Sequence, residues 1–260
     1  MFATSLPLRK LALSPAHRAV EKLYLAFSPV WMAIIAYCML THCFATWGDV
    51  GHLGLGLGLS LPLWLIPLFL PSESEQGIPF LQRHSTKSNL FVALMSFVQC
   101  YFGSAMFFEG LGMQYHFPTT WSLSGTPVFL YLVTVAYFST YYALMRLGLR
   151  WFLQVVPSPG RTLVWLVIAA LSYSMAFGET FFMASPSLAA FFSYADRHKA
   201  LLIGSLCYGT LFFISLPVFL RLDEDPRVPT PMSRLFWQTM GANMLILCAY
   251  ELYKVLLPRV

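Results

Sequence analysis

The clearest shortage in this 260-residue sequence is charge. Only 10% of the residues are Asp, Glu, Lys or Arg, well below the share of about a quarter typical of soluble domains. Hydrophobic residues make up 58% of the chain. A water-soluble globular protein is therefore excluded, and the composition predicts a multi-pass integral membrane protein of the all-α class.

Several motifs that carry chemistry are also absent. There is no Gly-rich phosphate loop, no G-x-S-x-G and no H-E-x-x-H, which argues against nucleotide use and hydrolysis. The cysteines form no C-x-x-C and the histidines show no metal-ligand spacing, so we expect no metal and no cofactor. Without a basic stripe or an RNA-binding signature, no nucleic-acid partner is expected. The sequence indicates no protein partner, which leaves membrane lipid and a small apolar substrate.

Long apolar stretches define the predicted architecture. We expect one membrane domain, 1–260, that consists of a bundle of about seven transmembrane helices. Its first 22 residues form a polar, basic segment that lacks a signal-peptide core. The spans are predicted at 23–47, 50–70, 89–110, 126–148, 161–184, 199–220 and 233–257. In the second of these, Gly54 and Gly58 form a small-xxx-small pair, which predicts a close helix contact.

The distribution of basic residues predicts the orientation. With a cytoplasmic N-terminus, twelve of the 16 Lys and Arg residues fall on cytoplasmic segments, in agreement with the positive-inside rule. The membrane would be the endoplasmic reticulum in a eukaryote or the inner membrane in a bacterium. The segment that contains Asp223 and Glu224 would then be cytoplasmic, and Asp196 and Arg197 would face the other side. Asp196 is well placed to cap the helix that follows it.

Acidic residues inside the apolar spans are the main functional candidates. Glu179 lies within Leu163–Ala184, which is otherwise free of charge, and an ionisable group at membrane depth is costly enough to indicate a function. Desolvation favours the neutral form of such an acid, which suits proton donation. Glu109 and Glu251 fall at similar depths. They either face Glu179 or end their helices in the headgroup region.

Several blocks resemble a known family. They are ALSYSMAFGET at 170–180, YADRHKALLIGSLCYG at 194–209, FISLPVFLRLDE at 213–224, RHSTKSNL at 83–90, FFEGLGMQYHFP at 107–118 and MSRLFWQTMGANML at 232–245. Together they make the chain similar to cycloeucalenol cycloisomerase, the cyclopropyl sterol isomerase of plants. The resemblance implies an enzyme that protonates the 9β,19-cyclopropane of cycloeucalenol, leaves positive charge at C9 and removes the C8 proton to give obtusifoliol.

The resemblance and the residue chemistry together give the predicted site. We assign catalytic roles to Glu179 as proton donor and to Glu251 or Tyr142, since histidines of the family's fourth span are replaced here by residues such as Tyr142. Four aromatic residues are predicted to line the sterol cavity and stabilise the cation. They are Trp31, Tyr101, Tyr173 and Tyr208. Structural or gating roles are expected for Asn89, Asp196, Arg197, Asp223 and Glu224.

Two other classes of protein compete with this interpretation. A non-catalytic membrane protein that binds or transports sterols would use the same aromatic cavity, and the missing histidines favour it. A seven-helix receptor with retinal would need a lysine in the middle of a span, whereas Lys254 lies at the end of the last one. Loss of turnover with retained sterol binding in Glu179→Gln would distinguish the enzyme from the binder.

Overall fold

The structure is a computed structural model that describes residues 14–225 and 227–256. Five long helices are continuous: α1 (Pro15–Leu40), α3 (Asp49–Phe69), α6 (Val128–Val155), α7 (Arg161–Met183) and α10 (Met232–Leu256). Two others contain a π-helical turn. They are α4 (His84–Val98) with η4 (Gln99–Gly103) and α5 (Ser104–Leu111), and α8 (Arg197–Lys199) with η6 (Ala200–Gly204) and α9 (Ser205–Leu220).

The remaining elements are short. They are α2 (Cys43–Thr46), the 3₁₀ turns Glu73–Glu75, Phe80–Gln82 and Pro186–Leu188, and the strands β1 (Gln114–Tyr115), β2 (Ser122–Leu123), β3 (Thr126–Pro127) and β4 (Phe192–Ser193). β1 pairs antiparallel with β4, and β2 pairs antiparallel with β3. The β1–β4 pair ties the segment after α5 to the segment after α7, next to the cavity described below.

Helix length and composition confirm the predicted all-α membrane class. In the described part of the chain, six helices are long and apolar enough to cross a bilayer: Pro15–Leu40, Asp49–Phe69, His84–Leu111, Val128–Val155, Arg161–Met183 and Arg197–Leu220. The seventh predicted span corresponds to α10, which has 25 residues but is less apolar than these six. Arg234, Glu251 and Lys254 all lie in α10 and account for part of this difference.

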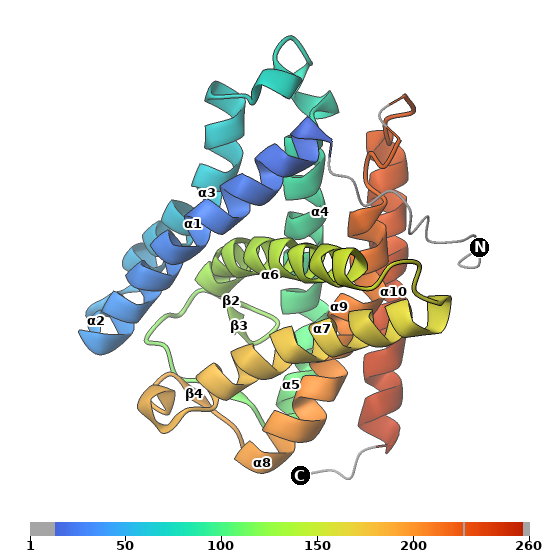
Figure 1. The fold of residues 1–260 in the computed structure, drawn as a ribbon. Coiled ribbons are helices and arrows are strands. Elements are labelled where there is room, and N and C mark those ends of the chain that lie inside the picture. The colour runs from blue at the N-terminus through green and yellow to red at the C-terminus, as the bar shows by residue number, and fades with distance from the viewer. Residues whose placement is uncertain (1–13, 226, 257–260) are drawn as a thin grey trace.

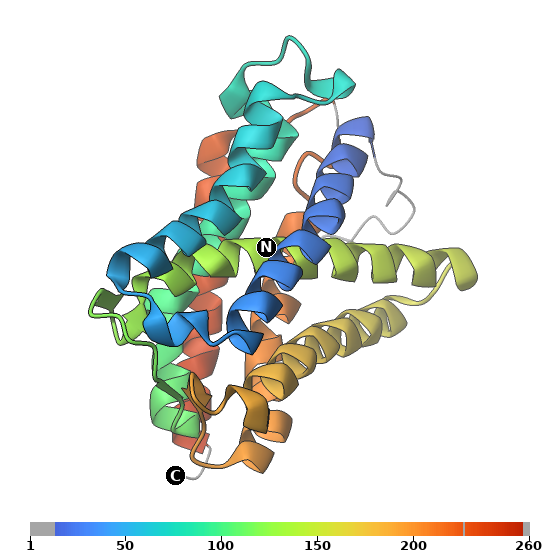
Figure 2. The same ribbon diagram turned by 90° about the vertical axis from the view of Figure 1, so that its left-hand side faces the viewer.

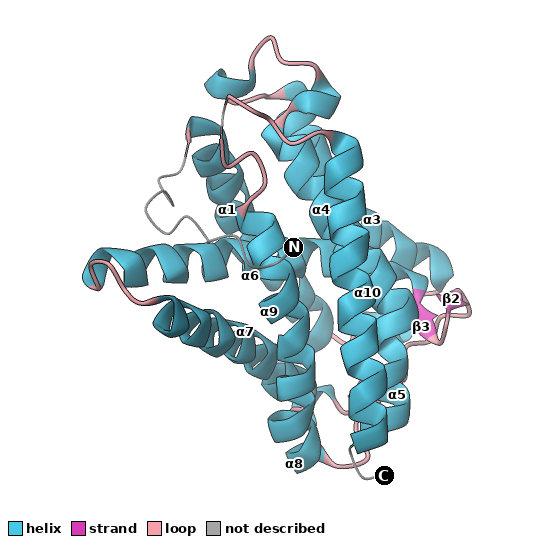
Figure 3. Cartoon of the chain, turned by 90° about the vertical axis from the view of Figure 1, so that its right-hand side faces the viewer, coloured by secondary structure: helices cyan, strands magenta, loops and turns pink. Residues whose placement is uncertain are grey.

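The helices do not all run side by side. In Figure 1, α3, α4–α5, α9 and α10 follow the long axis of the molecule, whereas α6 and α7 run across it. The same crosswise arrangement is visible after a quarter turn in either direction (Figures 2 and 3). The helix at the centre of this crossing is α6, and 72% of its apolar stretch is buried. A central, crossing helix can supply side chains to several neighbours at once.

Small side chains set two of these crossings. A Cβ on Gly56 would lie 3.0 Å from the backbone oxygen of Phe129, so α3 and α6 meet there. A Cβ on Gly209 would lie 3.2 Å from the Cα of Tyr173, where α7 crosses α9. The predicted contact through Gly54 and Gly58 is wrong, because in the described part of the chain no atom of another element lies within 4 Å of a Cβ built on either. Gly56 lies between them in sequence and so on a different face of α3.

The first helix begins earlier than predicted. It starts at Pro15, eight residues before the expected boundary at 23, because the Ser14 side chain accepts a hydrogen bond from the backbone N–H of His17. Proline at the first helical position favours the same start. The rest of the predicted polar segment, 1–13, lies outside the described residues. Near this end of α1, Glu21 forms a bidentate ion pair with Arg150 of α6 at 2.7 and 2.8 Å.

Candidate active site

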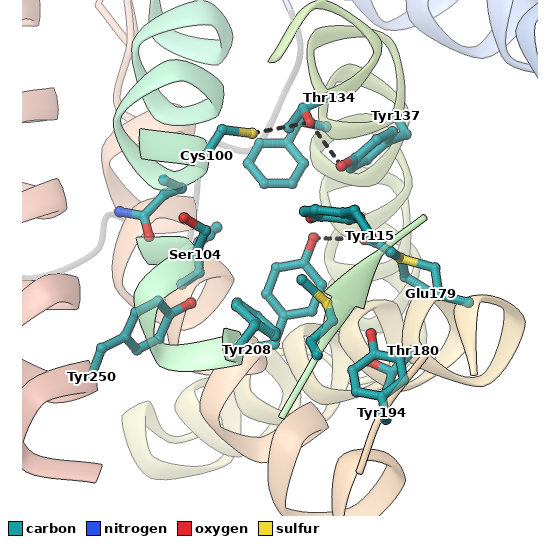
Figure 4. A pocket seen from close by; sticks show the side chains of 16 residues that line it. Cys100, Ser104, Tyr115, Thr134, Tyr137, Glu179, Thr180, Tyr194, Tyr208 and Tyr250 are labelled. Atoms are coloured by element: carbon teal, nitrogen blue, oxygen red, sulfur yellow. Dashed lines mark hydrogen bonds between the residues drawn. The ribbon is translucent and has the colours of Figure 1, made fainter. Parts of the chain in front are cut away.

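A cavity of about 70 Å³ lies where α4–α5, α6, α7, α9 and α10 meet, and β1 closes one side (Figure 4). Most of its lining side chains are aromatic or carry a hydroxyl, and one is a carboxylic acid. They are Gln99, Cys100, Ser104, Phe107, Met113, Tyr115, Thr134, Tyr137, Phe138, Glu179, Thr180, Met183, Tyr194, Tyr208, Leu211 and Tyr250. We call this space the Glu179 cavity.

Two π-helical turns shape its walls. One, Gln99–Gly103, contributes Gln99 and Cys100 and is followed at once by Ser104. The other, Ala200–Gly204, lies just before the turn of α9 that carries Tyr208. A π-helical turn adds a residue to the helix and rotates the side chains beyond it, and such turns are frequent at functional sites. Both interrupted helices therefore present side chains to the same cavity.

Glu179 is the one carboxylic acid among the described residues that line the cavity. It is partly buried near the end of α7, and its Oε2 accepts a hydrogen bond of 2.6 Å from the hydroxyl of Tyr208. The hydroxyl of Tyr141 lies within hydrogen-bonding reach of the same carboxyl group. Two phenol groups therefore hold the acid in place and would stabilise its anion after it gives up a proton.

Aromatic rings and one short polar chain surround this acid. The Phe107 ring meets Tyr208 and Tyr250 edge to face, with centroids 5.4 and 6.3 Å apart. Thr134 links the hydroxyl of Tyr137, at 2.8 Å, to the thiol of Cys100, at 3.3 Å. Figure 4 shows Thr134 and Tyr137 on one wall and Tyr208 beside Glu179. The π-faces provide the surroundings that favour a developing cation.

Three buried polar atoms on the cavity wall have no hydrogen-bond partner within residues 14–225 and 227–256. They are Oε1 of Gln99, Oγ of Ser104 and the hydroxyl of Tyr250, and each residue is at least nine-tenths buried. In Figure 4, Ser104 and Tyr250 lie on the side of the cavity away from Glu179. Because leaving a buried polar atom unpaired is costly, such atoms at a cavity wall indicate a place for a polar group of a ligand or for water.

The structure brings together two of the residues predicted for catalysis and substrate binding. Glu179 and Tyr208 come from different blocks of the sequence and meet because α7 packs against α9 where the two helices cross. The predicted catalytic residue Glu251 is placed elsewhere. Its side chain is 70% exposed and bonds Lys254 at 2.7 Å, and Lys254 also binds the exposed Glu109. Glu251 therefore shares no cavity with Glu179 and is not retained in the proposed site.

Tyr142 is also placed away from the cavity. It is fully buried, and its hydroxyl pairs with that of Ser215 at 2.6 Å. Its ring packs between Phe91, Phe212 and Phe219 as part of the hydrophobic core. With a satisfied hydroxyl and no access to the cavity, Tyr142 has a packing role in this structure.

The other predicted cavity aromatics also lie outside the lining. Trp31 is buried in a separate apolar cluster, where its Nε1 donates to Thr140 at 2.9 Å. Tyr101 is 43% exposed and packs edge to face against Phe102. Tyr173 stacks on Phe177, the next residue on the same face of α7. Of the four predicted aromatics, Tyr208 alone is among the described lining residues.

A second polar region, which we call the Asp223 cluster, consists of His17, His84, Lys87, Asp223 and Thr230. Lys87 donates to both carboxylate oxygens of Asp223 at 2.9 and 3.1 Å, and Nδ1 of His84 lies 3.1 Å from one of them. The backbone N–H of Thr230 adds a bond of 2.7 Å. Burial alone would raise the pKa of Asp223, but the bonds from His84 and Lys87 lower it to about 2.

The Asp223 cluster ties three segments together at one end of the molecule. His17 of α1 reaches the backbone oxygen of Leu222 at 2.9 Å and packs against the His84 ring of α4. Asp223 has a φ of 50°, a left-handed conformation that Asp tolerates better than most residues. None of the five residues of the cluster lines the Glu179 cavity. Asp223 and Glu179 therefore belong to two separate polar regions of the protein.

The remaining predicted structural residues make local contacts. Asn89 is buried, accepts from Tyr24 at 2.8 Å and donates to the backbone oxygen of Leu63 at 2.6 Å. Glu224 is exposed next to the cluster.

The pair at the start of α8 also makes local contacts. Asp196 accepts from the backbone N–H of Lys199 at 3.0 Å, which lowers the pKa of Asp196. Arg197 donates to the backbone oxygen of Ala184 at 2.7 Å.

Several lining residues were missed by the sequence interpretation. Gln99 carries a detectable signal, because a polar amide inside an apolar span is unusual in the same way as Glu179. Tyr137 and Tyr250 carry none, since tyrosine is abundant throughout the spans. Within the described residues, no group of three or more His, Cys, Asp or Glu side chains could hold a metal ion.

The fold and the cavity define a polytopic helical membrane protein that holds a carboxylic acid in an aromatic pocket. The chain is similar to a protein named cycloeucalenol cycloisomerase from Arabidopsis thaliana, with 28% identity over 262 aligned positions that cover 99% of this chain and 92% of the relative. This similarity confirms the resemblance predicted from the sequence blocks. No family model matches the chain, and no solved structure matches it.

Proposed function

We propose that this protein is a membrane-embedded isomerase that opens the 9β,19-cyclopropane ring of a cyclopropyl sterol, as in the conversion of cycloeucalenol to obtusifoliol. The name of the Arabidopsis relative supports the isomerase class, and the multi-pass helical fold suits a substrate that is dissolved in lipid. The reaction would take place in the endoplasmic reticulum membrane of a eukaryote or the inner membrane of a bacterium.

The observation that carries the proposal is the setting of Glu179. Its carboxyl group lies in an aromatic cavity and bonds Tyr208 at 2.6 Å, with Tyr141 in reach. A neutral acid in such surroundings is a suitable proton donor, and the two phenols would stabilise the carboxylate that remains. A pocket built only to bind an apolar ring system has no need of a carboxylic acid in its wall.

The reaction balances without a redox partner. Glu179 gives its proton to the cyclopropane carbon C19, the C9–C19 bond breaks, and C19 becomes a methyl group. The positive charge left at C9 faces the aromatic lining. Loss of the proton at C8 then forms the double bond between C8 and C9. Since Glu179 is the one carboxylic acid in the described lining, the same group would accept this proton and return to its starting state.

The size of the cavity adds a requirement. Its volume of about 70 Å³ is well below the roughly 300–1,000 Å³ typical of pockets that enclose a drug-sized ligand. The helices around it must therefore separate before a sterol nucleus can reach Glu179. We expect the cavity of the sterol-bound protein to be several times larger, with the hydrocarbon tail remaining towards the lipid.

The proposal is tested by supplying cycloeucalenol to the purified full chain in lipid vesicles and analysing the sterols by gas chromatography and mass spectrometry. Obtusifoliol should form in proportion to the amount of protein and the time, and heat-denatured protein should form none. If cycloeucalenol binds to the protein but is recovered unchanged, the chain is a sterol-binding protein and the proposal is wrong.

A further inference from the structure

The Glu179 cavity has a second polar side that the proposed proton transfer does not use. Eight buried side-chain polar atoms lack a partner among the described residues, and three of them, on Gln99, Ser104 and Tyr250, line this one cavity. Gln99, Ser104 and Tyr250 are 6%, 5% and 2% exposed, so bulk solvent does not satisfy them. These atoms are therefore available to form hydrogen bonds with a polar group that enters the cavity.

The orientation of Gln99 is fixed by its neighbours. Its Nε2 donates to Oδ1 of Asn243 at 2.8 Å, and Nδ2 of Asn243 donates to the backbone oxygen of Thr239 at 3.1 Å. This chain of amides leaves Oε1 of Gln99 as a free acceptor. Because Asn243 and Thr239 belong to α10, the same helix that carries Tyr250, the acceptor and the phenol are held by one rigid element.

The acceptor and the phenol are also close together. Oε1 of Gln99 and a ring carbon of Tyr250 both lie within 3.3 Å of the point where a Cβ on Gly103 would be. Glycine at this position in the π-helical turn therefore leaves the space that Gln99 occupies. Ser104 is the next residue of the chain, so its hydroxyl belongs to the same corner of the cavity.

The chemistry of these three groups selects a ligand. Gln99 can only accept through Oε1, whereas the hydroxyls of Ser104 and Tyr250 can each donate. A carboxylate or phosphate would be repelled by the Gln99 oxygen, and no charged side chain other than Glu179 lines the cavity in the described part. A neutral hydroxyl group fits, because it donates one hydrogen bond and accepts up to two.

We propose that Gln99, Ser104 and Tyr250 form the subsite for the 3β-hydroxyl group of the sterol. This inference rests on the proposed sterol substrate and assigns its orientation. With the hydroxyl of ring A in this corner, the fused ring system extends towards Glu179 on the other side of the cavity. The subsite thus determines which carbon meets the acid, and it makes the free 3β-hydroxyl a requirement for productive binding.

The test measures binding of two sterols that cannot react, 5α-cholestan-3β-ol and its analogue without the hydroxyl, 5α-cholestane. For the purified full chain in detergent, the hydroxylated sterol should bind about tenfold more tightly, since one or two net hydrogen bonds are worth about that factor. In Tyr250→Phe the preference should fall to about threefold or less, while the affinity for 5α-cholestane should change by less than about twofold. Ser104→Ala should act in the same direction.

A matched control is available on the same helix. Tyr253 lies outside the cavity, and its hydroxyl pairs with Thr210 at 2.8 Å. Tyr253→Phe should therefore keep the full preference for the hydroxylated sterol. If the wild type does not discriminate between the two sterols, or if both cavity variants keep the discrimination, the subsite is occupied by water or is packing only and the inference is wrong.

This experiment separates the subsite from the isomerase proposal. Neither probe has a cyclopropane ring, so its binding does not depend on proton transfer by Glu179. Hydroxyl-dependent binding without turnover of cycloeucalenol would support the subsite and contradict the isomerase proposal. Turnover without hydroxyl-dependent binding would support the isomerase proposal and contradict the subsite.

Discussion

The Glu179 cavity and the Asp223 cluster are both polar regions in an apolar protein, but they differ in how many of their polar atoms have hydrogen-bond or ionic partners. In the cluster, both carboxylate oxygens of Asp223 have a cationic partner within 3.1 Å, and the backbone N–H of Thr230 adds a further bond. In the cavity, the described residues give Glu179 phenols and no cation, and they leave three other lining polar atoms without a partner.

This difference indicates different roles. A buried ion pair whose hydrogen bonds are satisfied fixes the relative positions of its helices and has no capacity left for a ligand. A partly buried acid with unpaired polar neighbours is costly for stability, and proteins retain such arrangements at functional sites. The two regions should therefore respond in opposite ways to substitution, with stability changing at the cluster and turnover changing at the cavity.

The largest effect on stability is expected for Lys87→Met. This variant removes the cation from Asp223, whose side chain is only 12% exposed, so the carboxylate is left buried without its main partner. We expect the free energy of unfolding to fall by about 3 kcal/mol, at the lower end for broken buried ion pairs. Thermal unfolding in detergent measures it.

Lys254→Met is the matched control for Lys87→Met. Its two partners, Glu109 and Glu251, are 65% and 70% exposed, so this change should cost less than about 1 kcal/mol. Equal losses in the two variants would contradict the distinction between a buried and a surface ion pair.

Lowering the pH should reduce stability through the same cluster, by a smaller amount than Lys87→Met. The pKa of Asp223 lies at about 2, below the ordinary value of 3.8, so its ionised form adds stability that is fully present above pH 4. As the pH falls from about 4 to about 2, this contribution is lost. The melting temperatures of the wild type and Asp223→Asn should therefore converge over this range, and a difference that stays constant from about pH 4 to about pH 2 would contradict this prediction.

A comparison of two tyrosines tests the boundary of the cavity. Tyr208→Phe removes the phenol that bonds Glu179, and we expect turnover to fall about tenfold, the effect of one hydrogen bond to a charged group. Tyr142→Phe removes a hydroxyl that pairs with Ser215 in the core and should keep turnover within about twofold. Initial rates per folded molecule give both values. A larger loss of turnover in Tyr142→Phe would contradict the packing role and support the predicted catalytic role of Tyr142.

Orientation in the membrane is the last comparison and involves no loss of activity. Single cysteines at Ser72 and Ser187 should react with a membrane-impermeant maleimide from opposite sides, the first from the cytoplasm. The five native cysteines, of which Cys248 is exposed, must be replaced by serine in both variants. Labelling of both positions from one side would overturn the orientation predicted from the basic residues.

Much of the fold follows from the sequence because apolar stretches of bilayer length have few alternatives to a helix. The six most apolar helices were placed in this way, and Glu179 was identified because charge is rare at that depth. The crosswise path of α6 and α7 and the two π-helical turns were not predicted. They depend on contacts between helices, such as those at Gly56 and Gly209, which no local pattern encodes.

Two of the missed residues differ from predicted ones by a single position. The sequence interpretation selected Tyr142 and Glu251, whereas their neighbours Tyr141 and Tyr250 reach the Glu179 carboxyl group and line the Glu179 cavity, respectively. Adjacent side chains of a helix point about 100° apart, so the rotation of the helix about its axis determines which of the two reaches the cavity. An amphipathic stripe normally shows which side of a helix faces the protein interior. Spans that are apolar on all sides have almost no such stripe.

Turnover of cycloeucalenol by Glu179→Gln tests the central claim most directly. Glutamine keeps the shape of the side chain and can still accept from Tyr208, but it cannot donate the proton to C19. We expect turnover to fall by at least about two orders of magnitude, the effect of a general acid, with thermal stability close to that of the wild type. Glu251→Gln should leave turnover unchanged, because that side chain lies outside the cavity. Full activity in a folded Glu179→Gln variant would contradict the account.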